Sequence, residues 1–337
     1  MKKILAISAL LLGAVSLQVS AQDYTEQDPT KHVARVFPMP VKHLTMHSNV
    51  LNCDKNFSVI LPKSYDKDTT RKYPVLYLLH GHGENDWEWA NIPVSMINER
   101  ISQVTNDGSA AEMIIVQPNA TEYQSGYFNQ EGWKYEDYFF NELIPLIEKN
   151  FRVIPDKGHR AIAGLSMGGG GSFYYGCSHP EMFSAVYAIS AAVGSFATGK
   201  TAVPGPAGNA KAAEGINEKN AGPQFQNYGK KNDKKADAKP AQAPAAQAQN
   251  NTFTSGIDLE NLDPAKAEEM KTVAWTLDCG DDDFLFAGNV QTYQQMKKLG
   301  MNIQFRTREG VHASYYWYEA LGLAMQFATR HFSEQCK

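Results

Sequence analysis

The sequence has few cysteines and lacks the pairs that most thiol sites need. Among its 337 residues are four, Cys53, Cys177, Cys279 and Cys336, with no C-x-x-C pair. Zinc and thiol redox sites commonly use that pair, so neither kind of site is supported. An oxidising compartment would permit disulfides, although a chain of this length can build its core without them. The spacing identifies no pairing, and we predict neither metal nor other cofactor.

The sequence also lacks an excess of positive charge. Lys and Arg number 32 against 36 Asp and Glu, a net charge of −4, and no basic stripe is interleaved with aromatic residues. Proteins that bind nucleic acid typically present such a stripe to the phosphates. We therefore predict no nucleic-acid partner.

Long hydrophobic runs are absent after the first twenty residues. The chain begins with Met1-Lys2-Lys3 and a short apolar run, and small residues end this segment at Val19-Ser20-Ala21. This pattern predicts a secretory signal peptide over residues 1–21, cleaved after Ala21, and a periplasmic or secreted protein. No cysteine follows the cleavage point, which disfavours a lipid anchor; a retained membrane helix is the alternative. No membrane span is predicted in the mature protein.

What the sequence does contain is a regular alternation of strands and helices. Two antiparallel strands are predicted between residues 41 and 62. Further strands are predicted at 73–79, 113–116, 161–163, 183–189, 272–277 and 302–306, and helices at 92–104, 138–151, 290–299 and 316–332. We expect one domain over residues 22–337, an α/β fold whose doubly wound, mostly parallel sheet has helices on both faces.

One interval, residues 194–270, breaks this alternation. Its centre is a low-complexity stretch rich in Lys, Ala, Pro and Gln. Such a composition buries too little apolar surface to offset its ordering entropy, so we predict a disordered insertion at about residues 229–251. A cationic ligand-binding segment is the alternative. The flanks, 196–228 and 253–270, lie where this architecture inserts a cap over its active site.

The chain is organised around a serine at a predicted strand-to-helix turn. Gly164-Leu165-Ser166-Met167-Gly168 follows the apolar residues 161–163 and precedes a run of small residues. A G-x-S-x-G turn of this kind exposes a hydroxyl above the end of a strand and needs glycine where side chains would meet the backbone. Ser166 is therefore the candidate nucleophile.

A serine nucleophile needs an imidazole base, which in turn needs an acid. Three histidines follow Ser166: His179 is expected in a surface turn, His331 is expected to be exposed, and His312 follows the last strand. His312 is the predicted base. The acid is expected in Gly280-Asp281-Asp282-Asp283-Phe284, after the preceding strand; a calcium site is the rival interpretation of these carboxylates.

The oxyanion formed during acyl transfer needs two backbone N–H donors. One is expected from Met167, directly after the serine. The other is expected from His82, in the sequence His80-Gly81-His82-Gly83 after the first buried strand. A metal site on His80 and His82 is a weaker alternative, because no third ligand stands out nearby.

These motifs together resemble the esterase D and feruloyl esterase family of α/β-hydrolases, which also includes carbohydrate esterases similar to family 1. The resemblance is carried by residues 73–83, 163–169, 279–285 and 310–312 with Trp317. It implies a triad of Ser166, Asp283 and His312, with His82 and Met167 as oxyanion donors. Asp283 also precedes Phe284 and Leu285, which are expected to anchor the loop. Glu84 and Ser314 depart from the family pattern and are expected near the pocket mouth.

By this resemblance, the expected function is a serine carboxylic-ester hydrolase that removes feruloyl or acetyl groups from plant polysaccharides. The expected partner is a small-molecule or oligosaccharide ester. Two alternatives are an acyltransferase related to the mycolyltransferases, in which a hydroxyl group replaces water, and a non-catalytic glycan-binding protein on the same scaffold.

Overall fold

The computed structural model describes residues 23–26, 39–120, 126–193 and 257–333. The predicted signal peptide and the predicted insertion at 229–251 lie outside these residues. Within the described residues, nine strands form one sheet in the order β1-β2-β3-β7-β4-β10-β11-β12-β13. The strands are β1 (Thr25–Glu26), β2 (Val41–Ser48), β3 (Cys53–Ile60), β4 (Val75–Leu79), β7 (Ile114–Pro118), β10 (Arg160–Leu165), β11 (Ala185–Ile189), β12 (Ala274–Asp278) and β13 (Ile303–Arg306).

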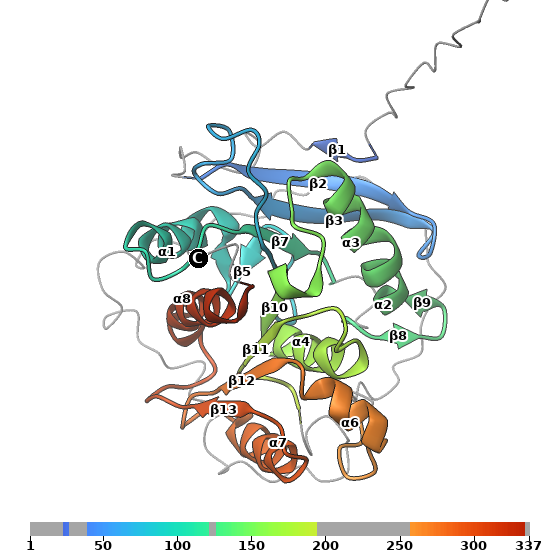
Figure 1. Cartoon of the computed structure of the whole chain (residues 1–337), viewed down its shortest axis with the longest axis vertical. Coiled ribbons are helices and arrows are strands. Elements are labelled where there is room, and N and C mark those ends of the chain that lie inside the picture. The colour runs from blue at the N-terminus through green and yellow to red at the C-terminus, as the bar shows by residue number, and fades with distance from the viewer. Residues whose placement is uncertain (1–22, 27–38, 121–125, 194–256, 334–337) are drawn as a thin grey trace, which may run out of the picture.

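The sheet has an antiparallel edge and a parallel body (Figure 1). β1, β2, β3 and β7 pair antiparallel in succession, whereas β7, β4 and β10 to β13 run parallel. The parallel strands β4, β7, β10 and β11 are buried along their whole length. This burial explains their nearly continuous apolar sequences, because helices cover both faces of such a strand. The predicted α/β class and mostly parallel sheet are confirmed.

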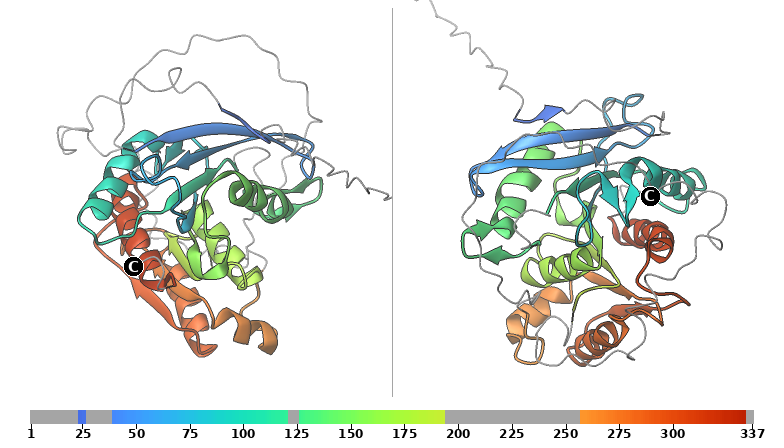
Figure 2. Two further views of the ribbon diagram at one scale, coloured as in Figure 1. Left: turned by 45° about the horizontal axis from the view of Figure 1, so that its top comes forward. Right: turned by 180° about the vertical axis from the view of Figure 1, so that it is seen from behind.

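Helices cover the two faces of the sheet, as Figures 1 and 2 show. The buried side chains form two separate cores, one on each face. The helices are α1 (Val94–Asn106), α2 (Tyr135–Tyr138), α3 (Ile144–Asn150), α4 (Met167–Ser178), α6 (Pro264–Met270), α7 (Phe286–Lys298) and α8 (Ser314–His331). α1 and α8 pack together against one face. The others contribute to the core on the opposite face, where α4 lies against β10 and β11.

Short elements complete the description. A π-helical turn η3 (Phe139–Leu143) joins α2 to α3, and a 3₁₀ turn η4 (Lys157–His159) precedes β10. The small pairs are β5 (Glu88–Trp89) with β6 (Ile92–Pro93), and β8 (Asn129–Gln130) with β9 (Trp133–Lys134). The predicted helix 138–151 therefore begins earlier, at Tyr135, and the predicted helix 92–104 begins two residues later, because Ile92 and Pro93 pair with β5. In the part of the chain described, no helix is long and apolar enough to cross a bilayer.

Candidate active site

The turn between β10 and α4 holds Ser166 in a conformation that few residues adopt. Its φ is 53° and its ψ is −114°, outside the usual regions for an L-residue. The glycines on either side make the turn possible: a Cβ on Gly164 would lie 2.3 Å from the Gly168 carbonyl oxygen, and one on Gly168 would lie 2.4 Å from that of Leu79. The turn places the partly exposed Ser166 at the carboxyl end of β10, as the sequence predicts.

Two loops from neighbouring strands bring a histidine and an aspartate to this serine. His312 Nε2 lies 3.0 Å from Ser166 Oγ, and His312 Nδ1 lies 2.9 Å from Asp283 Oδ2. Asp283 is buried, and its Oδ1 also accepts a hydrogen bond from the Leu285 N–H at 2.9 Å. The three side chains predicted for a triad thus form one hydrogen-bonded series. In this series the imidazole can accept the Ser166 proton while the carboxylate fixes its tautomer.

The other two aspartates of the acidic run point elsewhere. Asp281 and Asp282 are exposed, and Asp281 Oδ1 accepts a hydrogen bond from the Gly310 N–H at 2.9 Å. Asp282 N–H donates to the Gly310 carbonyl at 3.0 Å. The run therefore fastens the loop after β12 to the loop that carries His312. Among the described residues, no group of three or more His, Cys, Asp or Glu side chains could hold a metal ion.

Aromatic side chains surround the His312 ring. The buried Trp317 meets it edge-on, with ring centroids 4.7 Å apart, and donates a hydrogen bond from Nε1 to Ser190 Oγ at 3.0 Å. On another side, the Phe284 ring centroid lies 4.6 Å from that of His312, and this phenylalanine is 63% exposed. The indole holds the base in place, whereas Phe284 gives the site an accessible aromatic surface.

A buried polar cluster, which the sequence analysis did not predict, connects the loop that carries His312 to the sheet. Asp278, at the end of β12, accepts hydrogen bonds of 2.6 Å from the hydroxyls of Tyr187 and Tyr316. Arg308 Nη2 lies 3.4 Å from Asp278 Oδ1. Burial and the adjacent carboxylate raise the pKa of both tyrosines, which keeps them protonated as donors. The cluster joins β11, β12, the His312 loop and α8. No motif in the sequence marks it, because its members are far apart in the chain.

The loop after β4 carries the predicted oxyanion donor. His82 is exposed and Met167 is buried at the start of α4, where helix N–H groups are available to a ligand. His80 is fully buried: its Nε2 accepts from the Ala120 N–H at 2.9 Å, so Nδ1 donates to the Gly81 carbonyl at 2.8 Å. Burial lowers the pKa of His80 to about 4. With both ring nitrogens bound to backbone, His80 cannot serve the metal pair considered from the sequence.

Three other expectations are met in part or not at all. Glu84 is not at a pocket mouth: it is 2% exposed, inside the loop after β4. His331 is half-buried against Phe327, not exposed. His179 does follow α4, but its Nε2 lies 2.8 Å from a Glu136 carboxylate oxygen. Each difference arises from tertiary packing that local sequence does not reveal. Ser314 begins α8, two residues after His312.

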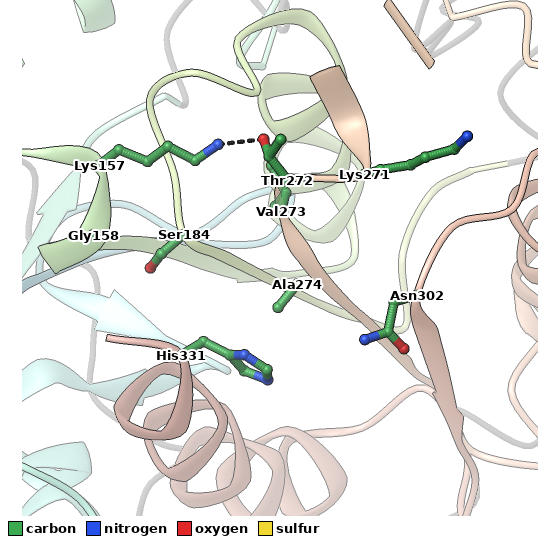
Figure 3. A pocket seen from close by; sticks show the side chains of 9 residues that line it. All are labelled: Lys157, Gly158, Ser184, Lys271, Thr272, Val273, Ala274, Asn302 and His331. Carbon is green, nitrogen blue, oxygen red and sulfur yellow. Dashed lines mark hydrogen bonds between the residues drawn. The ribbon is translucent and has the colours of Figure 1, made fainter. Parts of the chain in front are cut away.

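A pocket of about 410 Å³ lies at the amino ends of the parallel strands, away from Ser166. Most of the residues that line it come just before β10, β11, β12 or β13. Its lining includes Lys157, Ser184, Asn302 and His331, and Figure 3 shows Lys157 hydrogen-bonded to Thr272 across it. In doubly wound sheets ligands bind at the carboxyl ends of the strands. Ser166 lies at that end, so the candidate active site is the serine site.

The fold and the geometry at Ser166 define the class of protein, an α/β-hydrolase. Residues 48–327 match the family described as putative esterase, and the chain belongs to this family. A solved structure described as a ferulic acid esterase is 36% identical, with a TM-score of 0.68 over 88% of this chain and 100% of its own. These matches confirm the resemblance drawn from the motifs.

Two curated relatives and one further structure extend the comparison. An endo-1,4-beta-xylanase/feruloyl esterase of Xylanibacter ruminicola is 36% identical over 152 residues, which are 42% of this chain and 20% of that relative. An acetyl esterase of Caldicellulosiruptor saccharolyticus is 22% identical over 87% of this chain and 99% of its own. A ferulic acid esterase of Anaeromyces mucronatus shares the fold, with a TM-score of 0.58 at 17% identity, over 90% of this chain and 97% of its own.

Proposed function

We propose that this protein is a serine carboxylic-ester hydrolase with Ser166 as nucleophile, His312 as general base and Asp283 as the acid that orients it. The observation that carries the proposal is the hydrogen-bonded series of Ser166, His312 and Asp283 at the carboxyl edge of the sheet. Membership of an esterase family supports the same reaction.

The proposed reaction gives each of these groups a step. Ser166 Oγ attacks the ester carbonyl carbon while His312 Nε2 accepts its proton, and the oxyanion is held by the backbone N–H groups of His82 and Met167. The bond to the alcohol oxygen then breaks, and His312 returns the proton to that oxygen. Water attacks the acyl-enzyme in the same way, which releases the acid and restores the serine.

For the substrate, we propose feruloyl or acetyl esters of plant polysaccharides, reached by a protein exported to the periplasm or outside the cell. The relatives described as feruloyl and acetyl esterases support these acyl groups. The exposed Phe284 ring beside His312 favours an aromatic acyl group or a sugar ring, because both bind well to an aromatic surface. The apolar N-terminus with its small residues before Gln22 supports export.

A hydrolysis panel tests this proposal. Wild-type protein and Ser166→Ala are assayed on p-nitrophenyl acetate, p-nitrophenyl butyrate, methyl ferulate and feruloylated arabinoxylan, with and without an added acceptor alcohol. We expect hydrolysis of methyl ferulate and of the polysaccharide ester by the wild type alone. Acyl transfer to the acceptor in place of hydrolysis would favour the acyltransferase. Polysaccharide binding without any turnover would favour a glycan-binding protein.

A further inference from the structure

The loop after β4 is closed by a buried carboxylate that the proposed reaction does not use. Glu84 Oε2 accepts a hydrogen bond from the Gly81 N–H at 2.8 Å, at the start of the loop. Its Oε1 accepts from the Asn91 N–H at 2.5 Å, and the Ala90 N–H also bonds to the carboxylate at the loop's far end. One side chain therefore joins the two ends of the loop that carries His82.

In the part of the chain that the structure describes, the hydrogen bonds of the Glu84 carboxylate all come from backbone N–H groups. Within the described chain no Lys, Arg or His forms an ion pair with it, and burial raises the pKa of Glu84 against the opposing effect of the N–H donors. A buried carboxylate without a counter-ion costs free energy. A glutamine could not replace it, since its NH₂ group would face N–H donors at one end of the loop. The site thus requires two acceptor oxygens.

The far end of the loop has a backbone that needs such support. Ala90 and Asn91 are consecutive non-glycine residues with positive φ, 59° and 54°. Positive φ is unfavourable for a residue with a Cβ, and the conformation persists only when the surroundings determine it. The hydrogen bonds from these two N–H groups to Glu84 supply that constraint.

The near end of the loop touches the nucleophile turn. A Cβ on Gly81 would lie 2.6 Å from Leu165 Cδ1 and 3.5 Å from Glu84 Oε2. Gly81, the residue before His82, is therefore packed between Glu84 and Leu165, the residue that precedes Ser166. The position of the His82 N–H relative to Ser166 Oγ depends on this packing, and an oxyanion donor contributes only when it is correctly placed.

We propose that Glu84 is a positioning residue: by fixing Gly81, it holds the His82 N–H where the oxyanion forms. This inference rests on the proposed function. Loss of the clamp should affect the transition state more than the bound substrate, because the oxyanion exists only during the reaction. We expect Glu84→Gln to lower kcat by about 10²-fold, near the lower end of the cost of losing one oxyanion donor, with KM changed less than about threefold.

The experiment compares Glu84→Gln with Glu84→Met and with Glu88→Gln, a matched control at an exposed position of the same loop. Glu84→Gln keeps one acceptor oxygen and is the milder change, whereas Glu84→Met keeps the side-chain volume but leaves the Gly81, Ala90 and Asn91 N–H groups without an acceptor. For each variant we measure the melting temperature, kcat and KM on p-nitrophenyl acetate, and the inhibition constant of phenylboronic acid, which forms a tetrahedral adduct on a serine nucleophile.

We expect kcat and boronate affinity to fall together in both Glu84 variants, and Glu88→Gln to behave as wild type. A folded Glu84 variant with kcat and boronate affinity within threefold of wild type would overturn the inference, even if its melting temperature fell. A loss confined to KM would overturn it as well. Failure of the proposed function would appear differently, as absence of Ser166-dependent hydrolysis in the wild type itself.

Discussion

At the scale of single residues, the account depends on which carboxylate meets His312. Of the three adjacent aspartates, Asp283 alone is buried and bonded to His312 Nδ1, whereas Asp281 and Asp282 face solvent. The Leu285 N–H donates to Asp283, and the buried Leu285 side chain holds this part of the loop inward. Phe284, which was expected to anchor the loop as well, is 63% exposed and does not. The sequence argument, that the aspartate next to Phe284 and Leu285 should be the shielded one, agrees with this placement.

We therefore predict that Asp283→Asn lowers kcat by about 10³- to 10⁴-fold, because an amide would favour the wrong imidazole tautomer. Asp281→Asn and Asp282→Asn should each cost less than about tenfold, since exposed charges are screened by solvent. Steady-state kinetics on p-nitrophenyl acetate provide the measurement. If Asp282→Asn were crippling and Asp283→Asn active, the assignment would be displaced by one residue.

A second carboxylate on the loop after β4, that of Asp86, should make the stability of the protein depend on pH without taking part in catalysis. Asp86 is buried beside Ser58 and His43, and burial raises its pKa to about 6 despite hydrogen bonds from Ser58 and Asn119. A carboxyl whose pKa is raised on folding stabilises the protein below its unfolded pKa, and this stabilisation is lost as pH rises through about 6.

We predict that the stability of wild type relative to Asp86→Asn falls between pH 3 and pH 7 by on the order of 3 kcal/mol, at 1.36 kcal/mol per pKa unit. Urea denaturation of both proteins at several pH values measures the difference. If the free energy of unfolding of wild type minus that of Asp86→Asn were independent of pH, or rose toward pH 7, the burial-dominated pKa would be contradicted.

At the scale of elements, the junction of β10 and α4 is the most demanding part of the fold. Gly168 faces the carbonyl oxygens of Leu79 and His80, which lie 2.4 and 2.6 Å from the position of a Cβ. These are backbone atoms of the last residue of the central strand β4 and of the residue after it, so they cannot move aside without disturbing the sheet. The same close packing brings the loop after β4 next to Ser166.

We predict that Gly168→Ala destabilises the protein by about 1–3 kcal/mol, the usual cost of inserting a methyl group into a packed interior. It should also lower kcat, because it displaces both the proposed nucleophile, Ser166, and the loop that carries the proposed oxyanion donor. Thermal denaturation and steady-state kinetics test the two effects. Wild-type stability and activity in this variant would show that the turn is looser than the structure indicates.

At the scale of the whole molecule, α6 was not predicted: it lies in the flank 253–270 that was expected where a cap is inserted, yet its Ala267 and Met270 are buried in the core. Periodicity did predict the main strands of the sheet, the helices α1, α3, α7 and α8, and the strand ends that meet at the site. It did so because buried parallel strands have continuous apolar sequences and their carboxyl ends share one edge. The burial of Glu84 and Asp86 in the polar loop His80–Trp87 could not be predicted, because the sequence does not distinguish a buried carboxylate from an exposed one. Lys55 is similar: it is fully buried over the rings of Trp133 and Tyr135, and only tertiary contacts reveal this.

The predicted insertion at 229–251 leads to a prediction for the whole chain. If that segment is solvated coil, replacing it with a short Gly/Ser linker should leave the melting temperature within a few degrees of wild type, because loop closure depends weakly on length. Differential scanning calorimetry of the two proteins measures this. A larger drop would mean that the segment packs against the domain. Activity is measured in parallel, because flanks that form a cap would change it separately.

The central claim is that Ser166 is the residue acylated during turnover. The most direct measurement is to treat the protein with a fluorophosphonate and locate the adduct by peptide mass spectrometry. We predict a single adduct on Ser166, no labelling of a folded Ser166→Ala variant, and a loss of about 10⁶-fold in its kcat. An adduct on another residue, or labelling that persists in the alanine variant, would contradict the account.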